Sequence, residues 1–148
     1  MSTRSNHRSQ SMIDLLLIPV SMASAWTGIE LHLAGHGAPH AVWEQWALTH
    51  VLASILFLVF GFLHVWHHQG WYKSLFRNGL GKKSRVTLAL TFIFLLIIVT
   101  GIILLVVIDG PNSSTGVFHF LLGIMLTILF VWHILRRWRS LAKMLKGR

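Results

Sequence analysis

One uninterrupted apolar run constrains this chain more than any other feature. Residues 86–108 include no charged side chain over 23 positions, which exceeds the ~20 residues that a helix needs to cross a hydrocarbon core of about 30 Å. A helix on the surface of a soluble domain presents a polar face to water, and this run offers no charged face at all. The sequence therefore excludes an ordinary soluble bundle and indicates a membrane protein.

Three further apolar runs occupy residues 13–33, 46–66 and 117–135. They are continuously apolar, whereas barrel strands alternate, so helices are the structure that satisfies their backbone polar groups within a bilayer. We expect an all-α membrane protein in which residues 1–148 form a single domain, a four-transmembrane-helix bundle. The basic segments 67–85 and 136–148 are expected to lie on the membrane surface.

The first of these runs is the weakest candidate because it carries Asp14 and Pro19. Arg4 and Arg8 precede it, and the small residues at 23–25 resemble a cleavage site. A cleaved signal peptide is therefore an alternative to a retained first span.

The basic residues predict the orientation of the chain. Of the 13 Lys and Arg residues, two precede the first run, five lie between the second and third, and six follow the fourth. Basic loops stay on the cytoplasmic side, so both termini are expected there, in a multi-pass protein of a bacterial inner membrane. These residues form no continuous stripe, so the net charge of +9 indicates contact with membrane lipid and not nucleic acid.

Histidines are the candidate functional residues. Spans two and four each carry two of them, His50 and His64, and His119 and His133, and ionisable groups in membrane helices indicate function. Both pairs are 14 residues apart, which places the two rings on one helix face, about 21 Å apart along the axis. Spans two and four run parallel in an up-and-down bundle, so His50 is level with His119, and His64 with His133.

Two imidazoles that face each other across a bundle core are the axial ligands that a six-coordinate haem iron requires. The chain has no cysteine, which excludes thioether attachment, so two non-covalent b-type haems are predicted. Small residues on the same faces leave room for a flat macrocycle or for close helix approach. These cofactor-binding candidates are Ser54, Gly61 and Gly123.

An internal repeat supports this pairing with different residues. Thr27-Gly28-Ile29 in span one and Thr100-Gly101-Ile102 in span three each precede a loop and a helix with two histidines. The chain is therefore predicted to consist of two parallel helix-pair repeats, which place equivalent histidines at equal depth.

The paired histidines and the repeated Thr-Gly step resemble those of four-helix di-haem b-type membrane cytochromes. This group includes the cytochrome b subunits of hydrogenases and formate dehydrogenases and the flavinylation-associated cytochromes, and the likeness covers roughly residues 13–138. The resemblance implies axial ligation of haem iron by His50, His64, His119 and His133.

The expected function is passage of electrons across the membrane, between a quinone pool and a partner redox protein, as a subunit of an oxidoreductase. Glu30 and His32 are candidates for proton exchange with a quinone, or simply polar residues at a helix end. Arg85, Arg136 and Arg137 are candidate donors to the propionates of the inner haem. Because the outer loops carry no Lys or Arg, the two haems are expected to differ in potential. The alternative is a haem-free membrane subunit, or a metal-binding or transport protein that uses the histidine clusters.

Three further histidines, His32, His36 and His40, repeat every four residues, as in a metal-binding helix face. Gly35, Gly37 and Pro39 interrupt the helix there, so an interfacial loop is the favoured interpretation.

Overall fold

The computed structural model describes residues 2–79, 85–107, 110–111 and 113–146, and it contains five helices in these ranges. They are α1 (Ser2–Ala34), α2 (His40–His67), α3 (Gln69–Asn78), α4 (Arg85–Val106) and α5 (Ser114–Lys146). Four of them, α1, α2, α4 and α5, contain segments that are long and apolar enough to cross a membrane. The prediction of an all-helical transmembrane bundle is confirmed at this level.

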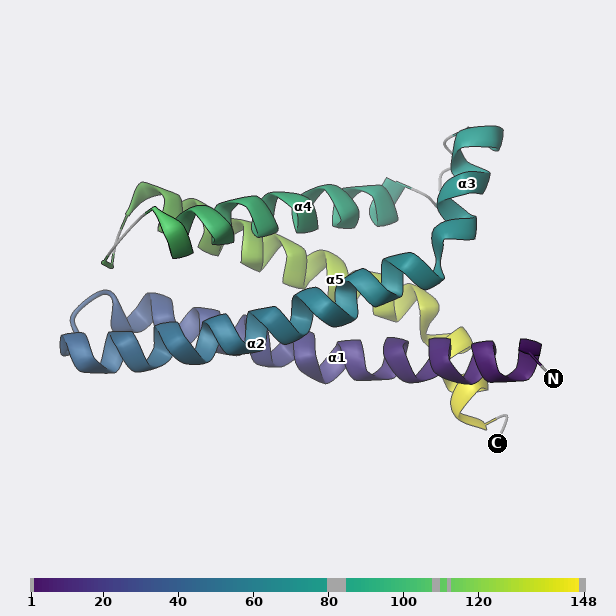
Figure 1. Ribbon diagram of the computed structural model, residues 1–148, viewed down its shortest axis with the longest axis horizontal. Coiled ribbons are helices and arrows are strands. Elements are labelled where there is room, and N and C mark those ends of the chain that lie inside the picture. The colour runs from purple at the N-terminus through teal and green to yellow at the C-terminus, as the bar shows by residue number, and fades with distance from the viewer. Residues whose placement is uncertain (1, 80–84, 108–109, 112, 147–148) are drawn as a thin grey trace.

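The four long helices run up and down along one axis (Figure 1). The connections from α1 to α2 and from α4 to α5 lie at one end of the bundle, which we call the loop end. Helix α3, the start of α1 and the end of α5 lie at the other, which we call the terminal end. Helices α2 and α5 therefore run in the same direction, as the histidine pairing requires.

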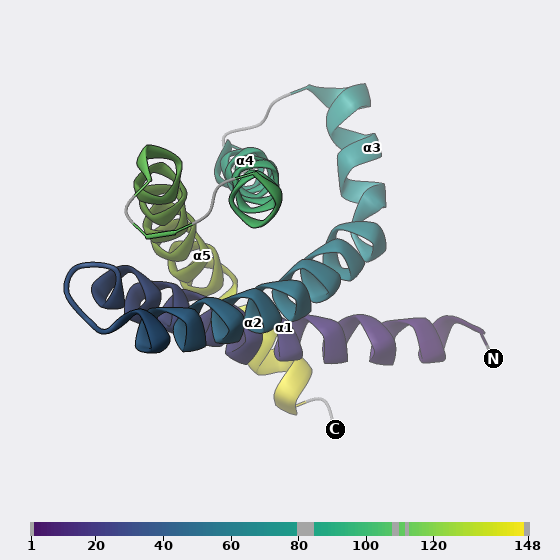
Figure 2. The same ribbon diagram turned by 60° about the vertical axis from the view of Figure 1, so that its left-hand side comes forward.

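The helices pack as two hairpins. Helix α1 lies along α2, α4 lies along α5, and α1 also contacts α5. Within the described ranges α2 makes at most slight backbone contact with α5, and Figure 2 shows the two helices crossing instead of lying along each other. The two helices that carry the paired histidines thus stand apart, and side chains or a bound group must fill the space between them.

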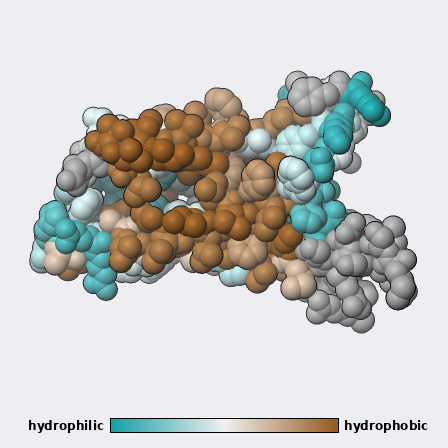
Figure 3. Space-filling model, viewed as in Figure 1, coloured by the Kyte–Doolittle hydropathy of each residue, from teal (hydrophilic) through white to brown (hydrophobic). Residues whose placement is uncertain are grey.

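Few apolar side chains are buried among the described residues, and one cluster of them lies in the second hairpin. Ile93 of α4 packs with Leu122 and Leu126 of α5, and Phe57 of α2 reaches this cluster. Most other large apolar side chains are exposed, and Figure 3 shows them as a broad brown belt between hydrophilic ends. In water such a surface would be unfavourable, whereas in a bilayer it is the surface that lipid covers.

Three of the four membrane-crossing helices, α1, α2 and α5, are longer than the predicted spans, whereas α4 ends at Val106, before the predicted residue 108. Helix α2 begins at His40 instead of residue 46, and α5 continues through the basic segment to Lys146. Polar and basic residues are good helix formers outside the hydrocarbon, so hydropathy finds the membrane crossing and misses the helix ends. Part of the other basic segment forms α3. The hydroxyl of Ser113 caps α5 by accepting a hydrogen bond from the Gly116 N–H at 3.0 Å.

Candidate functional site

The structure brings the predicted pair at the loop end together. The ring centroids of His50 on α2 and His119 on α5 lie 6.2 Å apart, with an angle of 80° between the ring planes. Two imidazole nitrogens that bind one metal ion at about 2 Å lie about 4 Å apart, which puts the ring centroids about 6 Å apart. The observed separation fits a metal centre between the two rings.

Two threonines hold these rings in the same way. Thr27 Oγ1 lies 3.2 Å from His50 Nδ1, and Thr100 Oγ1 lies 2.8 Å from His119 Nδ1. Each hydroxyl also lies within 2.9 Å of a carbonyl one turn earlier in its own helix, that of Ala23 for the first and Leu96 for the second. These are the threonines of the repeated Thr-Gly step.

The threonine contacts suit one tautomer of both histidines. A hydroxyl has one proton, and donating it to a backbone carbonyl leaves its oxygen as an acceptor. With the hydroxyl in this orientation, the Nδ1 atoms of His50 and His119 carry the ring protons and each Nε2 is unprotonated. An unprotonated Nε2 with Nδ1–H fixed by a neighbour is the form in which histidine ligates metals.

The glycines of the same step make room for the rings. A Cβ atom at Gly28 would lie 3.0 Å from His50 Cε1, and one at Gly101 would lie 3.3 Å from His119 Cε1. Both distances are tighter than ordinary van der Waals contact, so a larger residue would displace the ring. The Thr-Gly dipeptide therefore supplies both the hydrogen-bond acceptor and the space for one imidazole.

The other candidates at this end differ in their surroundings. The hydroxyl of Ser54 lies 3.1 Å from that of Ser24 on α1 and 3.4 Å from His50 Nε2. A Cβ atom at Gly123 would meet nothing within 4 Å. Gly123 thus borders open space, whereas Ser54 is engaged with α1 and makes a long contact with the ring.

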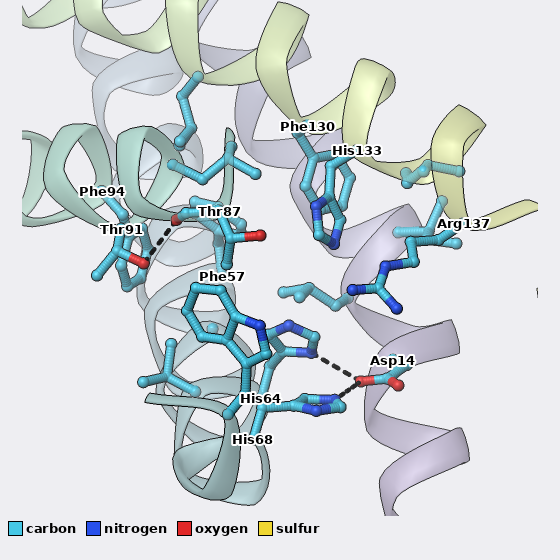
Figure 4. A pocket seen from close by; sticks show the side chains of 18 of the residues that line it. Asp14, Phe57, His64, His68, Thr87, Thr91, Phe94, Phe130, His133 and Arg137 are labelled. Atoms are coloured by element: carbon cyan, nitrogen blue, oxygen red, sulfur yellow. Dashed lines mark hydrogen bonds and ion pairs between the residues drawn. The ribbon is translucent and has the colours of Figure 1, made fainter. Parts of the chain in front are cut away.

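A cavity of about 400 Å³ lies toward the terminal end, between α2 and α5. His64 and His133 both line it, and Figure 4 shows His133 pointing into it from α5. The volume falls in the range of cofactor pockets, about 300–1,000 Å³. Its walls combine apolar and aromatic side chains with a few polar groups, among them Arg137. The aromatic lining residues are Phe57, Trp71, Tyr72, Phe94 and Phe130.

A carboxylate holds the histidine of α2 in this cavity. Asp14 Oδ1 of α1 lies 2.7 Å from His64 Nδ1 and 3.6 Å from His68 Nε2 (Figure 4). Since an ionised carboxylate only accepts hydrogen bonds, Nδ1 of His64 carries the proton and Nε2 is free, as in the two histidines at the loop end. Asp14, His64 and His68 also present ligand atoms within 4.8 Å of one another, and they form the one such group among the described residues.

Gly61 serves a close helix contact beside this cavity. A Cβ atom there would lie 2.8 Å from Phe94 Cζ, so the phenyl ring of α4 rests on the α2 backbone. Helix α3 covers the cavity from the terminal end, where Trp71 lines it and the Tyr72 hydroxyl lies 2.8 Å from that of Thr91. The sequence placed α3 on the membrane surface and gave no indication of this second contact.

The remaining histidines form no metal-binding group among the described residues. Helix α1 ends at Ala34 and α2 begins at His40, as the glycines and Pro39 predict. His32 stacks on Phe120 with ring centroids 3.8 Å apart, and His40 lies 3.3 Å from Glu44.

Comparison with known proteins adds no assignment. The chain matches no protein family, no curated protein and no solved structure. The functional argument therefore rests on the chain's own geometry.

Proposed function

We propose that this chain is a di-haem b-type cytochrome that carries electrons across a bacterial inner membrane. In this proposal His50 and His119 hold one haem at the loop end, and His64 and His133 hold the other at the terminal end. The observation that carries the proposal is the hydrogen bonding of three of these histidines. Each has Nδ1 fixed by an acceptor, so each presents a free Nε2.

The arrangement of the helices supports the same conclusion. Each proposed pair takes one ring from α2 and one from α5, the helices that stand apart. Fourteen residues separate the two levels on both helices, a rise of about 21 Å, so the sites lie toward opposite ends of the bundle. We infer that the hairpins are parallel repeats, because the Thr-Gly contact with a histidine occurs once in each.

Haem, when bound, supplies a one-electron Fe(III)/Fe(II) couple. The chain's contribution is to fill both axial positions with imidazoles, which favours electron transfer over oxygen binding. The side chains of Phe57, Phe94 and Phe130 exclude water from the terminal-end cavity, and Arg137 at its edge is a cation suited to propionate binding.

The proposed orientation of the chain in the membrane rests on its basic residues, and its proposed contact with lipid rests on its exposed apolar surface. We propose that the terminal end lies in the cytoplasm, because the basic termini and α3 are there, and that lipid covers the exposed apolar belt. We propose that a quinone in the bilayer and a redox partner protein exchange electrons with the chain, because the chain itself contains no flavin- or nucleotide-binding motif. The chain is then a subunit of an oxidoreductase.

A dithionite-reduced minus oxidised spectrum of the purified protein, with extracted haem counted per chain, tests the proposal. We expect a low-spin b-type spectrum and two haems per chain. If protein produced with an ample haem supply binds no haem, the proposed function is wrong. If it binds one haem per chain, only one of the two histidine pairs binds haem.

The cluster of Asp14, His64 and His68 favours a second function, in which a haem-free chain binds a divalent transition metal at the terminal end. One carboxylate and two imidazoles suit zinc or a similar ion. Metal analysis of the chain and of its His68→Ala variant separates the two functions. If neither protein contains haem and the His68→Ala variant loses a metal that the unaltered chain binds, the result supports the metal-binding function. Full haem content in both proteins supports the cytochrome function.

A further inference from the structure

The two ends of the bundle fix their histidines with acceptors of different charge. Thr27 and Thr100 are neutral, whereas Asp14 carries a negative charge 2.7 Å from His64 Nδ1. Among the described residues the ion-pair partners of Asp14 are two histidines, His64 and His68. Its carboxylate is thus directed at the imidazole that is proposed to bind haem.

This carboxylate breaks the internal repeat. Asp14 lies 13 residues before Thr27, and the residue 13 positions before Thr100 is Thr87. Thr87 lines the same cavity as Asp14 but is neutral. The first half of the chain therefore has a charged hydrogen-bond acceptor, Asp14, at the position where the second half has the hydroxyl of Thr87.

We propose that Asp14 is a positioning residue that orients His64 and lowers the midpoint potential of the haem at the terminal end. The inference rests on the proposed function. A carboxylate that accepts the Nδ1–H of a ligating histidine fixes the ring and raises the basicity of Nε2. A more basic axial ligand, and a negative charge nearby, stabilise ferric over ferrous iron, which lowers the potential.

Other charges near this cavity act in the opposite direction. Arg137 lines it as a permanent cation, and His68 Nε2 lies 3.6 Å from the Asp14 carboxylate. Comparing the midpoint potentials of the two haems therefore does not isolate the effect of Asp14. A substitution that removes only the charge of Asp14 isolates this effect.

The experiment is a potentiometric titration of the purified two-haem protein and its Asp14→Asn variant, followed in the visible haem bands. Asparagine keeps an acceptor oxygen and removes the charge. We expect the midpoint potential of the terminal-end haem to rise and that of the loop-end haem to stay unchanged. The matched control is Thr100→Val, which removes a neutral acceptor from His119 and should shift the loop-end haem alone, by less.

If the Asp14→Asn variant binds two haems at unchanged midpoint potentials, the inference is wrong and the proposed function still stands. If the unaltered chain binds no haem, the proposed function itself is wrong. If Asp14→Asn loses the terminal-end haem, Asp14→Glu decides between charge and shape. A Glu variant that retains this haem at the potential of the unaltered protein supports the role of the carboxylate. Loss of the haem from the Glu variant as well shows that side-chain shape matters, and overturns the inference.

Discussion

The loop end and the terminal end present paired histidines in different surroundings. At the loop end His50 and His119 have equivalent supports, a threonine acceptor and an adjacent glycine in each hairpin. At the terminal end His64 is held by a carboxylate and lines a cavity with aromatic walls. The comparison shows that the two hairpins contribute alike at the loop end, whereas Asp14 and Arg137 add charge and α3 adds cover at the terminal end.

The largest expected effect separates the two ends outright. His119→Leu should remove the loop-end haem and His64→Leu the terminal-end haem, because leucine fills much of the volume but offers no ligand. Haem extraction should give one haem per chain in each variant. His67→Leu is the matched control: its Nδ1 contacts the Leu63 carbonyl of its own helix, and it should retain two. Two haems in the His64 or His119 variant would defeat the assignment.

Gly61→Ala should destabilise the terminal end. Its methyl group would lie 2.8 Å from Phe94 Cζ, and forcing a ring out of a packed site costs about 1–3 kcal/mol. Thermal unfolding in detergent should show a lower midpoint. Gly70→Ala, on α3 with no neighbour within 4 Å, serves as the control and should be neutral or stabilising. Equal stability of the two variants would mean that the Phe94 contact is not close.

Tyr72→Phe should weaken the attachment of α3 over the cavity. It removes the hydroxyl that lies 2.8 Å from Thr91 Oγ1, a hydrogen bond with a net contribution of about 1 kcal/mol. Thr91→Val should have a similar effect, and the double variant should lose no more stability than the single variants do. Additive losses in unfolding experiments would show that the two hydroxyls do not interact.

The smallest expected effects compare the two glycines of the loop end. Gly28→Ala places a methyl group 3.0 Å from His50, and Gly101→Ala places one 3.3 Å from His119. Both rings should shift by a few tenths of an ångström, with the larger effect at Gly28. The rate of haem transfer to excess apomyoglobin should rise by a few-fold for the loop-end haem in Gly28→Ala and less in Gly101→Ala. A larger rate for Gly101→Ala than for Gly28→Ala would contradict the closer contact of Gly28 with its histidine.

The sequence predicted the membrane-crossing helices because charge-free runs of this length have one stable structure in lipid. It also placed His50 and His119 at one level, since helix geometry and parallel direction fix their depth. The same-face assignment of Gly61 and His64 agrees with the cavity lining, because both residues line the cavity.

Other parts of the site lay beyond sequence reasoning. From the sequence alone, Asp14 makes the first run a weaker candidate for a membrane helix. A carboxylate within an apolar run also indicates a buried partner. Its partner, 50 residues away, is defined by how α1 packs along α2. The threonines were recognised as a repeat, but their role depends on the crossing of neighbouring helices, which periodicity does not give.

The contacts of Thr27 with His50 and of Thr100 with His119 have a consequence for biogenesis. Each contact lies within one hairpin, α1 with α2 or α4 with α5. A hairpin that leaves the translocon thus already has its own imidazole oriented, before the other half of the chain has been made. Insertion can then proceed one hairpin at a time, and under the proposed function haem binding would join two prepared halves.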